Sequence, residues 1–340
     1  MIEVDASYGE GGGQLLRTAV ALAVLTGSGV RLVNVRAGRR RPGLAPQHLA
    51  AVRALAALCD ARCDGLELRS TRLVFEPRAR PGGGELRVEV GTAGSVTLVL
   101  QALVPVLLAA RATTRVVVAG GTDVRQAPTW DYFCRVLLPL LRRMGLGVEA
   151  SILRRGYYPR GGGEVAVQVE PGVPSPLVLA GGPSRWRIEG DAHVANLPVS
   201  IAERMRAAAL VALGGAGSVG ARGLSPDEAI GTGGAITVVA ESDGGRLGAS
   251  RVAERGVRAE ALGEALGREL AADLASGAAL DVHAADQVLV YTAMASGRSS
   301  FTARAISSHA RTAMWLIPKF LPARFALEER GGLARVSVER

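Results

Sequence analysis

The chain has 340 residues, of which 48% are hydrophobic and 4% aromatic, and its formal net charge is +9. This length allows a large core and favours two domains, and no apolar run is long enough to span a bilayer. The positive charge fits a polyanionic partner such as a nucleic acid or nucleotide, whereas the few aromatic residues do not indicate a base-stacking platform.

Arginine supplies nearly all of this positive charge, since Lys319 is the only lysine. Such one-sided usage, beside many Ala and Gly residues, indicates a genome-wide compositional bias, so the charge supports RNA binding only weakly. The scarcity of lysine is more useful as an exclusion. A Walker A loop needs a Gly-Lys-Ser/Thr ending, and a lysine–AMP transferase would have to use Lys319, which follows Pro318 in an apolar run.

The start of the chain enters a strand directly, without the basic stretch of a secretory signal. The cysteines are Cys59, Cys63 and Cys134, and the spacing of the first two is unlike the usual zinc or redox motifs. We therefore expect packed thiols in a reducing, cytoplasmic setting.

In chain order, the first predicted elements occur twice in the same sequence: strand, glycine loop, helix, strand, helix start and hairpin. Pro46 and Pro128 open the second helix of each copy, where proline is favoured. The repeated order indicates an internal duplication. Its first three members lie at residues 2–6, 9–13 and 18–26 in one copy and at 86–90, 91–94 and 98–110 in the other.

A third copy is predicted at the end of the chain, after a segment that breaks the pattern. We expect the division to be residues 1–181 for the first two units, 182–277 for a small inserted α/β domain, and 278–340 for the third unit. Within the insert we predict a strand at 185–189, a helix at 200–213, strands around 236–240 and 248–252, and a helix at 259–274.

The third unit places a histidine just inside a helix start. His309 follows Ser307 and Ser308, either of which can cap the helix by accepting a backbone N–H bond. A histidine in the first turn lies at the positive end of the helix dipole, which favours its neutral and nucleophilic form. The alternative for His309 considered alone is a structural surface or core histidine.

The glycine loops at 9–13 and 91–94 enter helix N-termini, where unpaired N–H groups can hold phosphate. Neither matches the Rossmann pattern, so each taken alone is more typical of a tight turn. Glu10 within the first loop would repel phosphate unless a divalent metal lay between them. It can equally orient an arginine or cap a backbone donor.

Together these residues resemble the RNA 3′-terminal phosphate cyclase family over nearly the whole chain. The motifs that carry the resemblance are Gly9-Glu-Gly-Gly-Gly-Gln-Leu-Leu-Arg17, Arg36-Ala-Gly-Arg39 with Pro42, Pro46-Gln-His48, Gly91-Thr-Ala-Gly-Ser95, Gln101, Gly120-Gly-Thr-Asp123, Tyr158-Pro-Arg-Gly-Gly-Gly163, Ala285-Asp-Gln287 and His309.

The resemblance implies a mixed α/β (α+β) fold of three repeated βα units in a pseudo-three-fold arrangement, with a small inserted α/β domain. It implies a reaction in which ATP adenylylates a histidine and AMP passes to an RNA 3′-phosphate. The adjacent 2′-hydroxyl then attacks that phosphate, giving a 2′,3′-cyclic phosphate and AMP. ATP, a divalent metal such as Mg or Mn, and RNA with a 3′-phosphate end are therefore the expected ligands.

The resemblance also implies a role for each matching position. His309 would be the adenylylated nucleophile and Glu10 would help hold the metal. Phosphates of ATP or RNA would be bound by Arg17, Arg36 and Arg39. Contacts with ATP would come from Gln101, Pro128, His283, Ala284, Ala285, Asp286 and Gln287.

Three other readings compete with this one. A non-catalytic cyclase-like protein serving ribosome assembly would lack the nucleophile, and His309 is present. An enolpyruvate transferase, which also has repeated α/β units, relies on lysines that this chain lacks. A general RNA-binding scaffold would need no histidine at that position.

Overall fold

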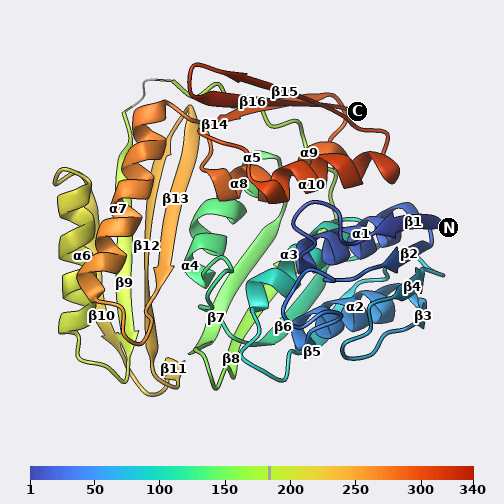
Figure 1. Cartoon of the computed structure of the whole chain (residues 1–340), viewed down its shortest axis with the longest axis horizontal. Helices are drawn as coiled ribbons and strands as arrows, with labels where there is room; N and C mark the ends of the chain where they lie inside the picture. Colours follow the sequence, from blue (N-terminus) through green and yellow to red (C-terminus); the bar gives the residue numbers. More distant parts are fainter. Residues whose placement is uncertain (183–184) are drawn as a thin grey trace.

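Four small sheets and the helices packed on them form the mixed α/β fold of this computed structural model (Figure 1). The structure describes residues 1–182 and 185–340. Residues 183 and 184, which fall in the predicted insert, lie outside the described residues. No helix within the described ranges combines the length and apolarity needed to cross a membrane.

The first sheet has the strand order β1-β2-β4-β3, with β1 parallel to β2 and β4 antiparallel to both of its neighbours. The predicted helix at 18–26 extends back to Gly13, because the glycine loop turns directly into it. The elements are β1 (Ile2–Asp5), α1 (Gly13–Thr26), β2 (Val30–Val33), α2 (Pro46–Cys59), β3 (Arg62–Asp64) and β4 (Leu73–Glu76).

The second sheet has the same order of pairing, β5-β6-β8-β7, with the short β11 added at its edge. The β5–β6 pair is again parallel, the β6–β8 and β8–β7 pairs are antiparallel, and β11 pairs parallel with β7. The elements are β5 (Gly84–Glu89), α3 (Val96–Leu108), β6 (Thr114–Gly120), α4 (Trp130–Tyr132), the π-helical turn η1 (Phe133–Leu137), α5 (Leu138–Arg143), β7 (Val148–Gly156), β8 (Gly163–Val169) and β11 (Ala229–Ile230).

The third sheet has the order β14-β16-β15. In place of the first strand of the other units, it has a single parallel bridge between Leu280 and Ala303. Two short helices precede the first strand of this sheet. The elements are α8 (Val282–Gln287), α9 (Leu289–Met294), β14 (Arg298–Ala303), α10 (Ser308–Leu316), the 3₁₀ turn η2 (Ile317–Lys319), β15 (Arg324–Arg330) and β16 (Leu333–Glu339).

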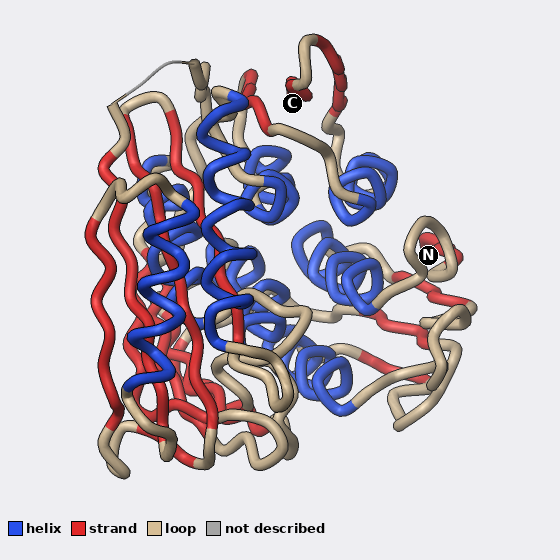
Figure 2. The backbone as a smooth tube through the Cα atoms, turned by 60° about the vertical axis from the view of Figure 1, so that its left-hand side comes forward, coloured by secondary structure: helices blue, strands red, loops and turns tan. Residues whose placement is uncertain are grey.

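The fourth sheet, with the order β10-β9-β12-β13, belongs to the predicted insert. The helices α6 and α7 pack on each other over one face of it, and α4 of the second unit contacts the sheet as well (Figure 2). The sequence analysis missed β10, whose Gly220 and Gly223 lower its strand propensity. The elements are β9 (Arg187–Ala195), α6 (Ser200–Ala212), β10 (Ser218–Leu224), β12 (Gly233–Ser242), β13 (Gly245–Val252) and α7 (Ala259–Ser276).

Two large hydrophobic cores and a small cluster of Tyr157, Ala195 and Ala229 accompany these sheets in the described part of the chain. The larger is built from α1, α2, α3 and the helices of the third unit, and Val239 is its one fully buried contribution from the insert's sheet. The smaller contains fully buried residues between Ala192 and Ala278 only. The division of the chain into these domains and its limits stay predictions.

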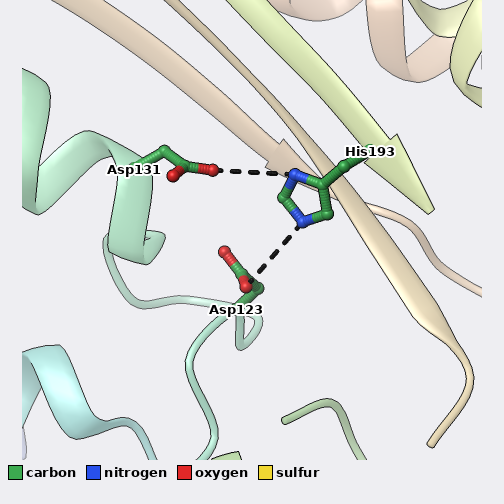
Figure 3. Close-up of side chains that lie close together, drawn as sticks. All are labelled: Asp123, Asp131 and His193. Atoms are coloured by element: carbon green, nitrogen blue, oxygen red, sulfur yellow. Dashed lines mark ion pairs between the residues drawn. The ribbon is translucent and has the colours of Figure 1, made fainter. Parts of the chain in front are cut away.

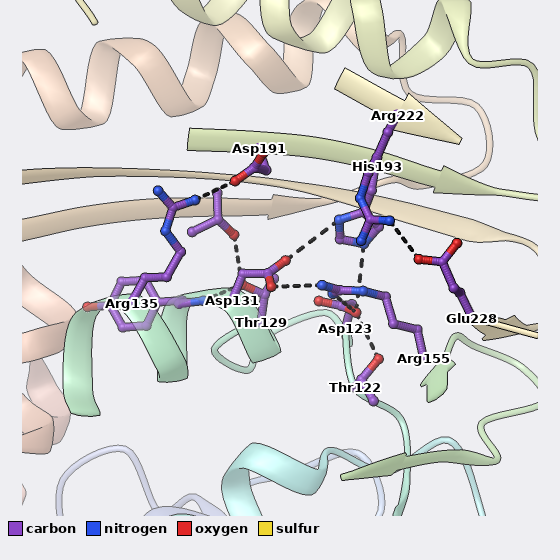
Figure 4. Close-up of polar contacts among 12 residues, drawn as sticks. Thr122, Asp123, Thr129, Asp131, Arg135, Arg155, Asp191, His193, Arg222 and Glu228 are labelled. Carbon is purple, nitrogen blue, oxygen red and sulfur yellow. Dashed lines mark hydrogen bonds and ion pairs between the residues drawn. The ribbon is translucent and has the colours of Figure 1, made fainter. Parts of the chain in front are cut away.

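A buried polar network holds the insert against the second unit (Figure 4). Arg155 on β7 pairs through Nη1 with Asp123 Oδ2 at 3.0 Å and through Nη2 with Asp131 Oδ1 at 2.7 Å. His193 on β9 lies 3.6 Å from Asp131, between its Nδ1 and the carboxylate Oδ2. Burial, reinforced by Arg155, lowers the pKa of His193, so the imidazole is neutral and Arg155 balances the carboxylates. The sequence analysis assigned His193 no role.

We predict that Arg155→Met lowers the free energy of unfolding by about 3–5 kcal/mol, because it leaves buried carboxylates without their partner. The matched control is Arg222→Met on β10, whose pair with Glu228 is exposed at the surface and is worth about 0–1 kcal/mol. Urea unfolding measures both. Equal losses for the two variants would contradict a special role for the buried network.

Candidate active site

Helix α10 carries His309 as its second residue, as the sequence predicted. Ser307 is the N-cap and its Oγ accepts a hydrogen bond from the Ala310 N–H at 2.9 Å, while Ser308 lies inside the helix. Ala310 and Ala313 bury the inner face of the helix against the core. The cap and this apolar face therefore fix the position of the His309 backbone in the site.

The first glycine loop runs along α10 and meets it beside His309. A Cβ on Gly9, whose φ is +65°, would lie 2.3 Å from Thr312 Oγ1, so only glycine allows this approach. The next residue, Glu10, places its Oε2 at 3.0 Å from His309 Nδ1. Its other oxygen, Oε1, pairs with Arg39. Glu10 therefore orients an arginine, one of the two alternatives that the sequence left open, and it also contacts the histidine.

The surroundings of His309 favour its neutral form. Burial lowers its pKa, Glu10 opposes this shift, and the charges of Arg17 and Arg39 add to it. The net direction is downward, so at neutral pH the imidazole is mainly uncharged. With 40% of its side chain exposed, the ring is still accessible to a ligand.

A small cavity lies between α1, α3, α8, α9 and α10, with a volume of about 40 Å³. It brings together Arg17, Gln101, Asp286 and Gln287, which come from different units of the chain. The space is close to that of one water molecule, so a nucleotide could enter only if wall side chains moved apart. The remaining lining residues are Gln14, Thr18, Leu137, Val290, Tyr291 and Ala313.

Four buried polar atoms on this wall have no hydrogen-bond partner within residues 1–182 and 185–340: Gln14 Oε1, Arg17 Nε, Gln287 Oε1 and Tyr291 Oη. Arg17 is only 6% exposed, and burial lowers its pKa to about 10. Leaving buried polar groups unpaired costs free energy. Arg17 Nε and Tyr291 Oη can donate hydrogen bonds to an anionic ligand, whereas the two amide oxygens would need a donor from the ligand. Sequence reasoning gave Tyr291 and Thr18 no role, because neither belongs to a recognisable motif.

Asp286 connects the cavity to the helix that carries the histidine. Its Oδ2 accepts a hydrogen bond from Ser307 Oγ at 3.1 Å, so it holds the cap of α10. Burial raises the pKa of Asp286 to about 7, against the opposing effects of His283 and Ser307. The carboxyl group thus changes charge near neutral pH.

Several predicted ligand contacts lie away from the cavity wall. His283 is exposed, with Nε2 at 3.8 Å from Glu269 Oε1, and the side chains of Ala284 and Ala285 are buried in α8. Pro128 accepts a hydrogen bond from Thr97 Oγ1 through its carbonyl at 2.8 Å. The assignments of these four residues to ATP stay predictions.

Arg36 and His48 have local structural partners. Arg36 Nη1 donates a hydrogen bond to the Gly43 carbonyl at 2.7 Å. The backbone φ of Arg36 is 54°, in the left-handed region. His48 Nδ1 accepts from the Ala45 N–H at 3.1 Å at the start of α2. Burial lowers the pKa of His48 to about 3, helped by the neighbouring arginines. His48 is therefore a neutral capping residue.

Among the described residues, Asp123, Asp131 and His193 are the only side chains grouped as metal ligands could be (Figure 3). Arg155 already pairs with both carboxylates in this cluster. A cation there would have to displace or oppose the guanidinium, so we interpret the group as an ion-pair network. Glu10 is separate from it and lies beside His309.

A neutral histidine at a helix start, beside a buried unpaired arginine, defines an α/β protein suited to binding phosphate-containing ligands. The model of the RNA 3′-terminal phosphate cyclase family matches residues 8–327. The chain belongs to this family.

Full-length relatives agree with this assignment. The RNA 3′-terminal phosphate cyclase of Nitrosospira multiformis is 53% identical over 342 residues, covering 99% of this chain and 96% of that protein. Those of Methanopyrus kandleri and Pyrobaculum neutrophilum are each 42% identical, covering 98% and 99% of this chain and 96% and 98% of their own. Among solved structures, the enolpyruvyl transferase NikO from Streptomyces tendae aligns at a TM-score of only 0.40, with 10% identity over 100% of this chain and 48% of that one.

We predict that Arg17→Met makes the ligand-free protein as stable as the original or more so, because it removes an unpaired buried charge. The same variant should lose stabilisation by inorganic triphosphate, which is worth about 2.7 kcal/mol for the original at one hundred times its Kd. Thermal unfolding with and without triphosphate measures both effects. Arg53→Met, an exposed change on α2, is the control and should keep the stabilisation.

We also predict a pH-dependent effect of Asp286→Asn. The carboxyl pKa is raised on folding, from 3.8 to about 7, so the folded state binds more protons than the unfolded state between these values, and stability is lost as pH rises. The variant should therefore gain stability relative to the original as pH rises from about 4 to 8. Chemical unfolding at several pH values checks this. A constant difference across that range would contradict the assignment.

Proposed function

We propose that this protein converts an RNA 3′-terminal phosphate to a 2′,3′-cyclic phosphodiester at the expense of ATP, as the names of its relatives imply. The observation that carries the proposal is His309, a neutral and accessible imidazole at a helix start, beside Glu10 and the cavity that contains Arg17. No ordinary structural role requires that combination.

In the first step, His309 attacks the α-phosphorus of ATP. Nδ1 lies 3.0 Å from Glu10 Oε2 and donates a hydrogen bond to it, so the lone pair of the neutral ring is on Nε2. The N–P bond forms as the bond to pyrophosphate breaks. The histidine then carries AMP, an intermediate that replaces one difficult step with easier ones.

In the second step, an oxygen of the RNA 3′-phosphate attacks the phosphorus of the histidine–AMP adduct and the N–P bond breaks, giving RNA(3′)pp(5′)A. The adjacent 2′-hydroxyl then attacks the RNA phosphorus and loses its proton, and AMP leaves. Charge develops on phosphate oxygens throughout, so fixed positive groups should supply most of the stabilisation. We assign this role to Arg17 and Arg39, and to Arg36 in a supporting position.

Glu10 would hold a divalent metal ion together with the phosphates of ATP. Mg²⁺ is often bound by one or two carboxylates plus substrate phosphates, so a single carboxylate here is sufficient. Such an ion would neutralise charge on the phosphates. For that to occur, Glu10 must release one of its present partners, Arg39 or His309.

We also propose that the three units are repeats arranged about a pseudo-three-fold axis. The matching strand order of the first two sheets and the Leu280 bridge in the third support this. Gln101 and Asp286 would contact ATP from the second and third units, and Gln287 beside Asp286 would do the same.

The decisive experiment incubates the protein with ATP labelled at the α-phosphate and a divalent metal. We expect an acid-labile, base-stable covalent AMP adduct that is absent from His309→Ala. Arg311→Ala, an exposed change on the same helix, is the control and should keep the adduct. An adduct that survives in His309→Ala would show that the nucleophile is another residue.

The overall reaction is tested with a 3′-phosphorylated RNA, whose end should become resistant to phosphatase. Adenylylation without this conversion would leave the RNA assignment unsupported. Failure of both in the original protein would favour a non-catalytic member that serves ribosome assembly.

A further inference from the structure

Two aromatic side chains stack at the surface beside the candidate nucleophile. The rings of Tyr8 and Trp315 lie 3.8 Å apart at an interplanar angle of 11°. The ammonium group of Lys319, the only lysine of the chain, lies 4.3 Å from the centre of the Trp315 ring. Trp315 is partly buried, whereas Tyr8 and Lys319 are exposed.

The stack lies in line with His309 along one helix. Tyr8, Gly9 and Glu10 meet α10 in turn, at Trp315, Thr312 and His309. These three helix positions are each three residues apart, so the loop runs along α10 in the opposite direction. At the rise of an α-helix, the stack is displaced from His309 by about 9 Å along the axis. This is comparable with the span from a nucleotide's 3′-phosphate to its own base or that of its neighbour.

The exposure of Tyr8 is not explained by packing. One face of its ring is covered by Trp315, yet 43% of the residue remains open to solvent. Single-stranded RNA ends are recognised by stacking of their bases on such rings. A positive charge lies at the stack, since the exposed ammonium group of Lys319 is close to the Trp315 ring, and such a charge attracts a phosphate backbone.

We propose that the Tyr8–Trp315 stack is the binding site for the base at the 3′ end of the RNA, with Lys319 attracting the backbone. This inference rests on the proposed function and adds to it a position for the end nucleotide. It differs from the expectation based on composition, because two of the chain's few aromatic residues stack at this point. Stacking reads no particular base, so the site should accept all four.

The test compares the original protein with Tyr8→Ala, Tyr8→Phe and Tyr158→Ala. Tyr158 is an exposed tyrosine, 77% open to solvent, and is the matched control. For Tyr8→Ala we expect unchanged adenylylation by ATP alone, and a KM for 3′-phosphorylated RNA raised about tenfold with little change in kcat. Tyr8→Phe keeps the ring and should behave like the original, as should Tyr158→Ala.

A second substrate separates stacking from a structural effect. Its last nucleotide is an abasic ribose that keeps the 2′-hydroxyl and the 3′-phosphate. The original protein should bind it about tenfold more weakly than the intact RNA, whereas Tyr8→Ala should bind both alike, because the two changes remove the same contact. If Tyr8→Ala still distinguishes the two RNAs, or loses adenylylation and cyclisation in proportion, the proposal is overturned and the stack only anchors the loop.

Failure of the proposed function gives a different result. If the original protein cyclises no RNA, binding of the same two oligonucleotides is followed without ATP by the part of the tryptophan fluorescence that Trp315→Phe removes, since the chain has three tryptophans. Quenching by the intact RNA and not by the abasic one supports the platform. Equal quenching, or none, counts against it. If the original protein cyclises RNA and Tyr8→Ala does so with the same KM, the platform alone is rejected.

Discussion

The contact between Glu10 and His309 joins the two ends of the chain and decides the chemistry of the site. It fixes the imidazole through Nδ1, so the other ring nitrogen keeps its lone pair. The contact depends on Gly9, which brings the loop against Thr312 without a side chain in the way. It depends equally on Ser307, whose N-cap hydrogen bond makes α10 begin directly before His309. A shift in either element would separate the carboxylate from the ring.

The proposed binding of phosphate depends on a difference between two buried arginines. Arg17 is buried with no carboxylate beside it among the residues that the structure describes, whereas Arg155, which is as deeply buried, is paired with two. The same residue type thus has two uses in one protein. Arg155 pairs β7 with Asp123 and Asp131, and Arg17 is the residue that we propose binds phosphate. The difference lies in whether the fold provides partners.

Local signals in the sequence were sufficient for many elements. The helix starts at Ser307 and Pro46 follow from caps and proline, which act within a few residues. Strand β10 was missed, because glycines weaken a strand that is formed by pairing with β9 far away in the chain. His193 was likewise left without a role, since its partners Asp123 and Asp131 come from another unit. Contacts at long sequence separation leave no local pattern.

The sequence by itself determined the family, the nucleophile candidate and the residue types around it, because motifs such as the glycine loop and the helix cap are local and specific. Only the tertiary structure decided which of them meet. It brought Glu10 to His309 and Gln101 to Asp286, left His283 facing Glu269, and set Tyr8 on Trp315. Each of these contacts depends on how α1, α3, α8 and α10 pack. Because the core is close-packed, the position of each helix depends on all of its neighbours.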